Sequence, residues 1–267
     1  MRSGFLVVLG AFLAVFPAAA STKLLVTVVE PKSGKPVTDL KAAEFVVFDD
    51  KTPRKVEAAE FSEGNMDVMM LLDTGLAGEM VRPLADGLIE QLQPKEQMAI
   101  VSYHSSADLI QDFTSSHDLL KRAVGTVKYG NNPQLLDALY AAIDGGFQNT
   151  TFRRVLVILT TGYEGRGRVG EKEVLKLARR NSVSIFPVYM VGAEKSLFEN
   201  LARQTGGASF NVREMRKTLT AGPGARIFEV LRSHYTLTVT GNLSLSERLK
   251  VDVQRAGKPS VSVLPIE

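Results

Sequence analysis

The feature that most constrains the fold of this chain is an alternation of apolar strands and amphipathic helices between residues 67 and 211. The predicted strands are short apolar runs: Val68–Leu72, Met98–Tyr103, Leu109–Phe113, Val155–Leu159 and Val183–Met190. Apolar residues at helical spacing predict the helices Ala77–Leu92, Leu119–Val127, Gln134–Phe147, Glu171–Arg180 and Leu197–Gln204. Such alternation is typical of right-handed crossovers, and continuous apolar strands indicate a sheet covered on both faces. We therefore expect an α/β fold with a doubly wound, mostly parallel sheet.

Both ends of the chain have β character. The N-terminal strands are predicted at Leu24–Val29, Glu44–Phe48 and Arg54–Phe61. A short helix, Ile227–Arg232, precedes C-terminal strands at Tyr235–Thr240, Arg248–Gln254 and Ser260–Leu264. Each β segment is too small to fold alone. We expect residues 21–64 to pair with residues 234–267 in a small β-sandwich-like unit. The α/β domain, residues 65–225, would be inserted between them, and residues 226–267 would form the C-terminal helix and β segment.

Residues 1–20 have the pattern of a secretory signal peptide. Arg2 provides the positive charge, Phe5–Phe16 is apolar, and three alanines precede Ser21. The alternative is an uncleaved membrane anchor, but a spanning helix needs about 20 apolar residues, and Pro17 interrupts this stretch early. We expect an exported protein, periplasmic or secreted, with no membrane span after cleavage.

Composition excludes several kinds of site. The chain has no cysteine and three histidines, so thiolate chemistry is excluded. The formal charge is only +3, and no basic run is long enough to predict binding to nucleic acid. No serine–histidine–aspartate or paired-glutamate arrangement can be defined. We expect a protein that is not an enzyme.

A site in a parallel sheet is expected where loops leave the carboxyl ends of the strands. The loops predicted there are Asp73–Ala77, His104–Ser106, Gly130–Pro133 and Thr160–Arg168. The first of them, together with several other stretches in the same order, resembles von Willebrand factor type A domains, and most closely the bacterial VWFA-related exported proteins. These other stretches are Lys35–Leu40, Glu44-Phe45, Leu135–Leu139, Val157–Gly162, Thr205–Gly207 and Leu231–Tyr235.

The resemblance implies a Rossmann-like α/β fold with a metal-ion-dependent adhesion site at the carboxyl edge. Its ligands in the family are an Asp-x-Ser-x-Ser motif, a threonine in a middle loop and the aspartate of a Thr-Asp-Gly turn. The corresponding residues here are Asp73, Gly75, Ala77, Pro133 and Thr161. Because Mg²⁺ prefers octahedral oxygen ligands, we expect a degenerate site, no bound Mg²⁺ and no other cofactor.

Each of these positions also has a purely structural interpretation. Asn132-Pro133 is a good helix start, with asparagine as the N-cap and proline at the first helical position. Asp73 could accept backbone N–H groups at the N-terminus of the helix that follows it. Glu164, in the neighbouring loop, could replace a missing ligand, but we expect it to form an exposed ion pair with Arg166 or Arg168.

The segment Gly165–Gly170 matches the dinucleotide-binding pattern Gly-x-Gly-x-x-Gly. Four residues separate it from the preceding strand, whereas that pattern requires its glycines in the strand-to-helix turn. We interpret the segment as a flexible, basic loop rather than a cofactor site.

The resemblance implies an adhesion-type module that binds a protein partner, and the missing ligands predict binding without a metal. Candidate contact residues on the edge loops are Thr74, Gly75, Leu76, Tyr103, His104, Tyr163, Arg166 and Arg168. His104 has a structural alternative as a satisfied surface histidine, and the two arginines could meet an acidic partner or simply face solvent. Two further alternatives are a structural scaffold of the cell envelope with an inert site, and cation-dependent binding through a non-standard site.

Overall fold

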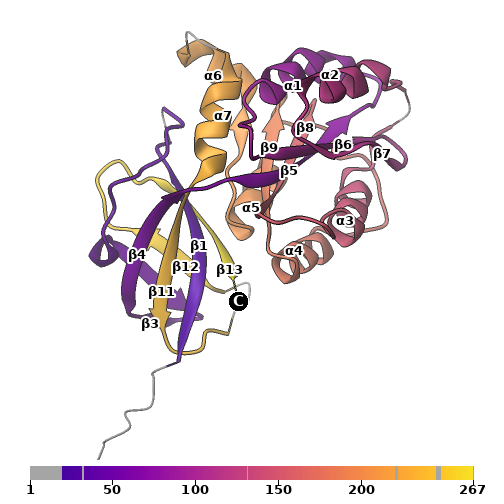
Figure 1. Cartoon of the computed structure of the whole chain (residues 1–267). Coiled ribbons are helices and arrows are strands. Elements are labelled where there is room, and N and C mark those ends of the chain that lie inside the picture. Colours follow the sequence, from indigo (N-terminus) through magenta and orange to yellow (C-terminus); the bar gives the residue numbers. More distant parts are fainter. Residues whose placement is uncertain (1–19, 32, 131, 220–221, 245–247, 267) are drawn as a thin grey trace, which may run out of the picture.

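The protein consists of an α/β unit and a β unit, which lie side by side in the computed structural model (Figure 1). The structure describes residues 20–31, 33–130, 132–219, 222–244 and 248–266. Except for residue 20, the predicted signal peptide therefore lies outside the described residues. None of the helices in the described part of the chain has the length and apolarity that crossing a bilayer requires.

The α/β unit is built on a six-stranded sheet with the order β10-β9-β8-β5-β6-β7. Its strands are β5 (Met66–Asp73), β6 (Gln97–Tyr103), β7 (Ala107–Thr114), β8 (Arg153–Thr160), β9 (Val183–Tyr189) and β10 (Phe210–Asn211). Only the β6–β7 pair is antiparallel among these described strands. Every residue of β5 is buried, as expected for a central strand covered on both faces.

Helices cover both faces of this sheet. One face packs against α1 (Arg82–Ile89), α2 (His117–Thr126) and α7 (Pro223–Arg232). The other packs against α3 (Leu135–Gly145), α4 (Glu171–Arg180) and α5 (Lys195–Gln204). The predicted doubly wound, mostly parallel α/β fold is thus confirmed.

The terminal segments form two antiparallel sheets that enclose a third core. The larger sheet has the order β13-β1-β11-β4, and the smaller one β12-β2-β3. Their strands are β1 (Ser21–Val29), β2 (Phe45–Asp49), β3 (Thr52–Arg54), β4 (Val56–Glu63), β11 (Ser233–Thr240), β12 (Lys250–Val253) and β13 (Ser260–Ile266). Alternate residues of β11 are buried, because this strand has one face on the core. The expected pairing of N- and C-terminal strands is therefore present, for example Val26 with Tyr235 and Val263.

Three local predictions were wrong. The helix expected over Ala77–Leu92 consists of a 3₁₀ turn, η2 (Gly78–Val81), followed by α1, because a proline at the start of α1 fits a new first turn. The strand expected over Arg54–Phe61 is divided between β3 and β4, which belong to different sheets. The helix α6 (Val212–Thr218) was not predicted at all.

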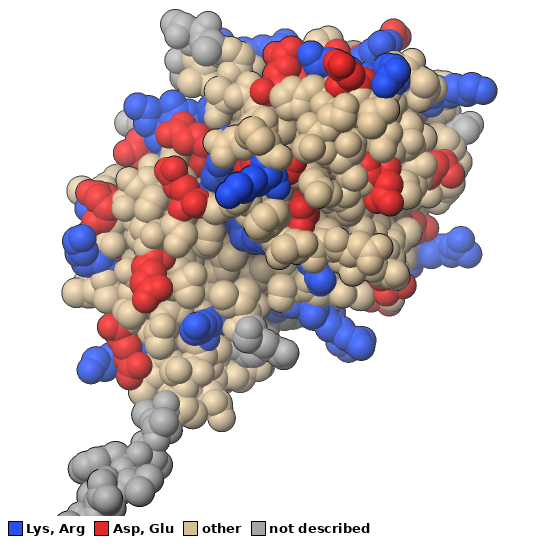
Figure 2. Space-filling view, in the orientation of Figure 1, with Lys and Arg blue, Asp and Glu red and all other residues tan. Residues whose placement is uncertain are grey.

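Charged side chains are mixed in sign on the visible surface. Figure 2 shows Lys and Arg interspersed with Asp and Glu over both units, without a broad area of one sign. Such a surface does not create the extended positive field with which proteins attract nucleic acid.

Candidate functional site

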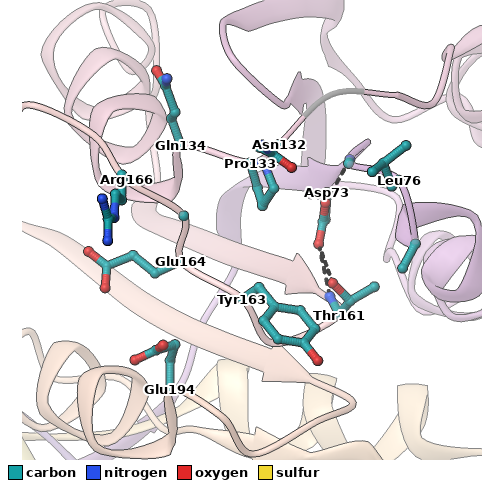
Figure 3. A pocket seen from close by; sticks show the side chains of 13 residues that line it. Asp73, Leu76, Asn132, Pro133, Gln134, Thr161, Tyr163, Glu164, Arg166 and Glu194 are labelled. Carbon is teal, nitrogen blue, oxygen red and sulfur yellow. Dashed lines mark hydrogen bonds between the residues drawn. The ribbon is translucent and has the colours of Figure 1, made fainter.

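The carboxyl ends of β5, β6 and β8 meet at one edge of the sheet, since these strands are parallel neighbours. Asp73, Tyr103 and Thr160 are the last residues of the three strands. Beside them opens a pocket of about 570 Å³ (Figure 3). Its lining residues are Asp73, Gly75, Leu76, Ala77, Asn132, Pro133, Gln134, Thr161, Tyr163, Glu164, Gly165, Arg166 and Glu194.

The carboxylate of Asp73 is fully buried and bonded by its neighbours. Its Oδ2 atom accepts hydrogen bonds from the hydroxyl of Thr160 at 3.0 Å, and from the backbone N–H and hydroxyl of Thr161 at 3.0 and 2.8 Å. Its Oδ1 atom accepts the backbone N–H of Gly75 at 2.8 Å. Buried carboxylates require such donors. Asp73 thus accepts two backbone N–H groups, but the prediction that they lie at a helix N-terminus was wrong. Gly75 precedes the N-cap of η2, and Thr161 follows β8.

Three candidate contact residues, Gly75 among them, are not on the surface. Thr74 and Tyr103 are fully buried, and the Thr74 hydroxyl donates to the backbone oxygen of Tyr103 at 2.9 Å. Burial raises the pKa of Tyr103 well above its usual value, and the nearby Asp73 carboxylate raises it further. Both side chains support the edge from within, so the prediction that they contact a partner was wrong.

The other candidates lie at the surface to different degrees. Leu76 is 78% exposed and Tyr163 is 52% exposed, although large apolar side chains are usually buried. Met80 and Val191 are exposed on adjoining segments. His104 is half-buried, and its Nδ1 atom lies 2.9 Å from the hydroxyl of the next residue, which agrees with the satisfied-histidine interpretation.

The loop between β8 and α4 contacts α3 and the residues before it. The carboxylate of Asp137 accepts the backbone N–H groups of Arg168 and Val169, each at 2.8 Å. Gly165 has φ +75°, and a Cβ atom there would lie 1.6 Å from the backbone oxygen of Pro133. The absence of a side chain at Gly165 thus allows the loop to pack closely against the residues before α3. The segment is thus bonded to its surroundings, and its flexibility stays a prediction.

Glu164 does not form the predicted ion pair. Among the described residues neither Arg166 nor Arg168 lies within salt-bridge distance of a carboxylate. Burial raises the pKa of Glu164 above its usual value, and the carboxylates of Glu194 and Glu171 raise it further. Glu164 therefore lies near two other carboxylates, and Arg166 lines the same pocket without coming within salt-bridge distance of it.

The von Willebrand factor type A domain model matches residues 72–221, which is more than half of the chain. The chain belongs to this family. Domains of the family are generally non-catalytic modules that bind proteins. No curated protein matches the sequence closely enough to count as a relative.

Solved structures with this fold are distant in sequence. Proximal thread matrix protein 1 from the mussel byssus, with a zinc-occupied MIDAS motif, has a TM-score of 0.56 and 15% identity. That match covers 69% of this chain and 50% of the mussel protein, so the chain spans about half the length of that relative. A von Willebrand factor type A protein from Catenulispora acidiphila has a TM-score of 0.51 and 10% identity, and the match covers 95% of this chain and 75% of that one. These likenesses describe the fold alone.

The type A fold brings together the five positions that the sequence comparison singled out. Asp73, Gly75, Ala77, Pro133 and Thr161 all line the pocket. Three of them have no oxygen in the side chain, and the Thr161 hydroxyl donates to Asp73. In the described part of the chain, no group of three or more histidine, aspartate and glutamate side chains could hold a metal ion.

Pro133 does not begin the helix, contrary to prediction. The helix α3 starts at Leu135, with Gln134 at the N-cap. The backbone N–H of Gln134 donates to the oxygen of His104, and that of Leu135 donates to the oxygen of Glu164, so both N–H groups connect loops of the edge. Pro133 instead forms part of the pocket wall in the type A domain.

Two residues important to this site were not anticipated. The hydroxyl of Thr160 donates a hydrogen bond to Asp73. Glu194, the N-cap residue of α5, lines the same pocket. The pair Thr160-Thr161 at the end of an apolar strand was a usable signal, because neighbouring parallel strands end together. Glu194 follows β9, whose carboxyl end was not included among the candidate loops.

Proposed function

We propose that this protein is an exported, non-enzymatic interaction module whose carboxyl-edge loops bind a protein partner directly, without a bridging divalent cation. The observation that carries the proposal is the bonding of Asp73, since both of its oxygens accept hydrogen bonds from neighbouring residues. Export is supported by the signal-like pattern of residues 1–20.

The available donors support metal-independent binding. Mg²⁺ requires about six oxygen ligands in near-ideal octahedral geometry and gives up its water reluctantly. Here Asp73, which is the one carboxylate among the five ligand positions of the family, would have to exchange hydrogen bonds from Thr160 and Thr161 for the ion. Leaving those buried donors unsatisfied would cost about 1–3 kcal/mol each. One ligand does not offset this cost together with the dehydration of the ion.

The rim of the pocket supports direct contact with a protein. Leu76 and Tyr163 are exposed on either side of it, with Met80 close by. Exposed apolar groups around a pocket are typical of binding sites, and tyrosine is among the residues enriched at energetic centres of interfaces. An envelope scaffold with an inert site is the alternative, and it would make no use of this rim.

A capture experiment separates these possibilities. The immobilised protein, its Leu76→Ser, Tyr163→Ala double variant and a matched control would be incubated with envelope extract of the source organism. The control, Leu119→Ser with Phe152→Ala, removes exposed side chains of the same kind from α2 and from the residue before β8. We expect one dominant partner, retained by wild type and control, lost by the rim variant, and unaffected by EDTA.

Two outcomes would contradict this proposal. Equal capture by all three proteins would favour the scaffold alternative. Capture that EDTA abolishes and Mg²⁺ restores would favour cation-dependent binding through a non-standard site.

A further inference from the structure

The pocket beside Asp73 has an acidic wall, formed by Glu164 and Glu194. Glu164 comes from the loop after β8 and Glu194 from the N-cap of α5. Both residues line the pocket, and Figure 3 shows their carboxylates on the same side of it, away from Asp73. The two glutamates are 30 positions apart in the sequence, and folding brings them into one pocket.

No described residue forms an ion pair with the acidic wall. Neither carboxylate has an ion pair or a side-chain hydrogen bond with another described residue. The half-buried Glu164 has a raised pKa because of burial and because Glu194 and Glu171 repel its charge. A positive group placed between the two glutamates would remove this repulsion, whereas a partner's carboxylate would increase it.

The rest of the lining fits a basic side chain rather than a free cation. The pocket contains three carboxylates, Asp73, Glu164 and Glu194, and one guanidinium, Arg166, so its formal charge is −2. Apolar surface from Leu76 and Pro133 lies opposite. Arginine combines an aliphatic stem with a planar cation that binds carboxylates and stacks on aromatic rings. The exposed ring of Tyr163 is placed beside the acidic wall for such stacking.

We propose that this pocket receives an arginine side chain of the protein partner, with its guanidinium between Glu164 and Glu194 and its stem against Leu76 and Tyr163. The inference rests on the proposed function, because it specifies which group of the partner enters the site. A volume of about 570 Å³ accommodates such a side chain together with flanking residues.

The test uses defined peptides with the full chain. Acetyl-Leu-Arg-Leu-amide would be titrated into ¹⁵N-labelled protein, with the corresponding lysine, norleucine and glutamate peptides as comparisons. We expect the arginine peptide to shift the amide signals of Gly75, Thr161 and Gly165, the lysine peptide to bind more weakly, and the other two not to bind. The Glu164→Gln, Glu194→Gln double variant should lose at least about fivefold in affinity. The matched control Glu60→Gln changes an exposed glutamate on β4 and should bind as wild type does.

Three results would overturn the proposal: tighter binding of the glutamate peptide, an arginine-peptide affinity unchanged in the double glutamine variant, or no arginine-peptide binding at about 10 mM. Capture of the natural partner distinguishes this failure from failure of the proposed function. If Leu76→Ser with Tyr163→Ala abolishes capture and the double glutamine variant does not, the edge binds a protein but not through an arginine. If both variants lose the partner, the acidic wall is part of the interface.

Discussion

Replacement of Asp73 by alanine tests the interpretation of the pocket most directly. The substitution removes the acceptor of four hydrogen bonds, two from hydroxyls and two from backbone N–H groups. The hydroxyls of Thr160 and Thr161 can rotate towards other acceptors, but the two N–H groups cannot move without the backbone. A buried polar group left unsatisfied costs about 1–3 kcal/mol. We therefore expect Asp73→Ala to lower the free energy of unfolding by about 3–5 kcal/mol.

The assay is urea unfolding at neutral pH, measured in EDTA and again in excess Mg²⁺. Asp144→Ala removes an exposed carboxylate from α3 and serves as the control, with an expected change within about 0.5 kcal/mol. A ligand that binds the native state raises its stability by mass action. We expect the same stability of the wild type in both solutions.

Two other results would contradict this interpretation of Asp73. If Asp73 served mainly to bind a cation, its charge would be unfavourable without the ion, and Asp73→Ala would be neutral or stabilising in EDTA. A loss below about 1 kcal/mol would therefore refute the hydrogen-bond argument. Stabilisation of the wild type by Mg²⁺ that disappears in Asp73→Ala would refute metal independence.

The remaining predictions concern stability elsewhere. Arg232→Met should lower the free energy of unfolding in urea by about 3–5 kcal/mol, because it removes the guanidinium that lies 2.6 Å from the fully buried carboxylate of Glu96. A loss below about 1 kcal/mol would contradict this. Burial lowers the pKa of His234 from 6.5 to about 4, so its contribution to stability is complete above pH 6.5 and falls by up to about 3 kcal/mol as the pH drops to 4. The stability difference between wild type and His234→Asn should therefore change with pH, and parallel pH profiles would refute the shift. Gly165→Ala should cost about 1–3 kcal/mol and perturb the pocket amides, because of its positive φ and the close backbone oxygen, whereas Gly170→Ala, with only an ordinary contact, should change little.

Hydrophobic periodicity was sufficient to predict most of the fold. The strands β5, β8 and β9 are continuous apolar runs, which only a sheet covered on both faces explains. The helix α6 was not predicted because its seven residues are mostly polar and charged. The division between β3 and β4 depends on which sheet each strand joins, and local sequence does not specify that.

The sequence predicted where the site lies but not which side chains contact each other there. Sequence comparison identified Asp73 and the edge loops, since strand ends fix where loops emerge. It could not indicate that Thr74 and Tyr103 are buried, because the residues that cover them come from other parts of the chain. Nor could it indicate that Glu164 forms no ion pair with the arginines two and four residues away, or that the carboxylate of Glu194 raises its pKa. Loop conformation decides such pairings, and here it depends on backbone contacts between the β8–α4 loop and the residues before α3.

Charge compensation connects the two proposals for this edge. The negative charge of Asp73 is met within the chain by hydrogen bonds from Thr161 and its neighbours. Glu164 and Glu194, which lie in the same pocket, form no ion pair with any described residue. A positive charge brought from outside therefore gains little at Asp73 and most at the acidic wall. A bare divalent cation would find there two carboxylates without the further ligands it needs. The guanidinium of a partner's arginine is already attached to the partner's chain, so it needs only the two carboxylates as hydrogen-bond acceptors.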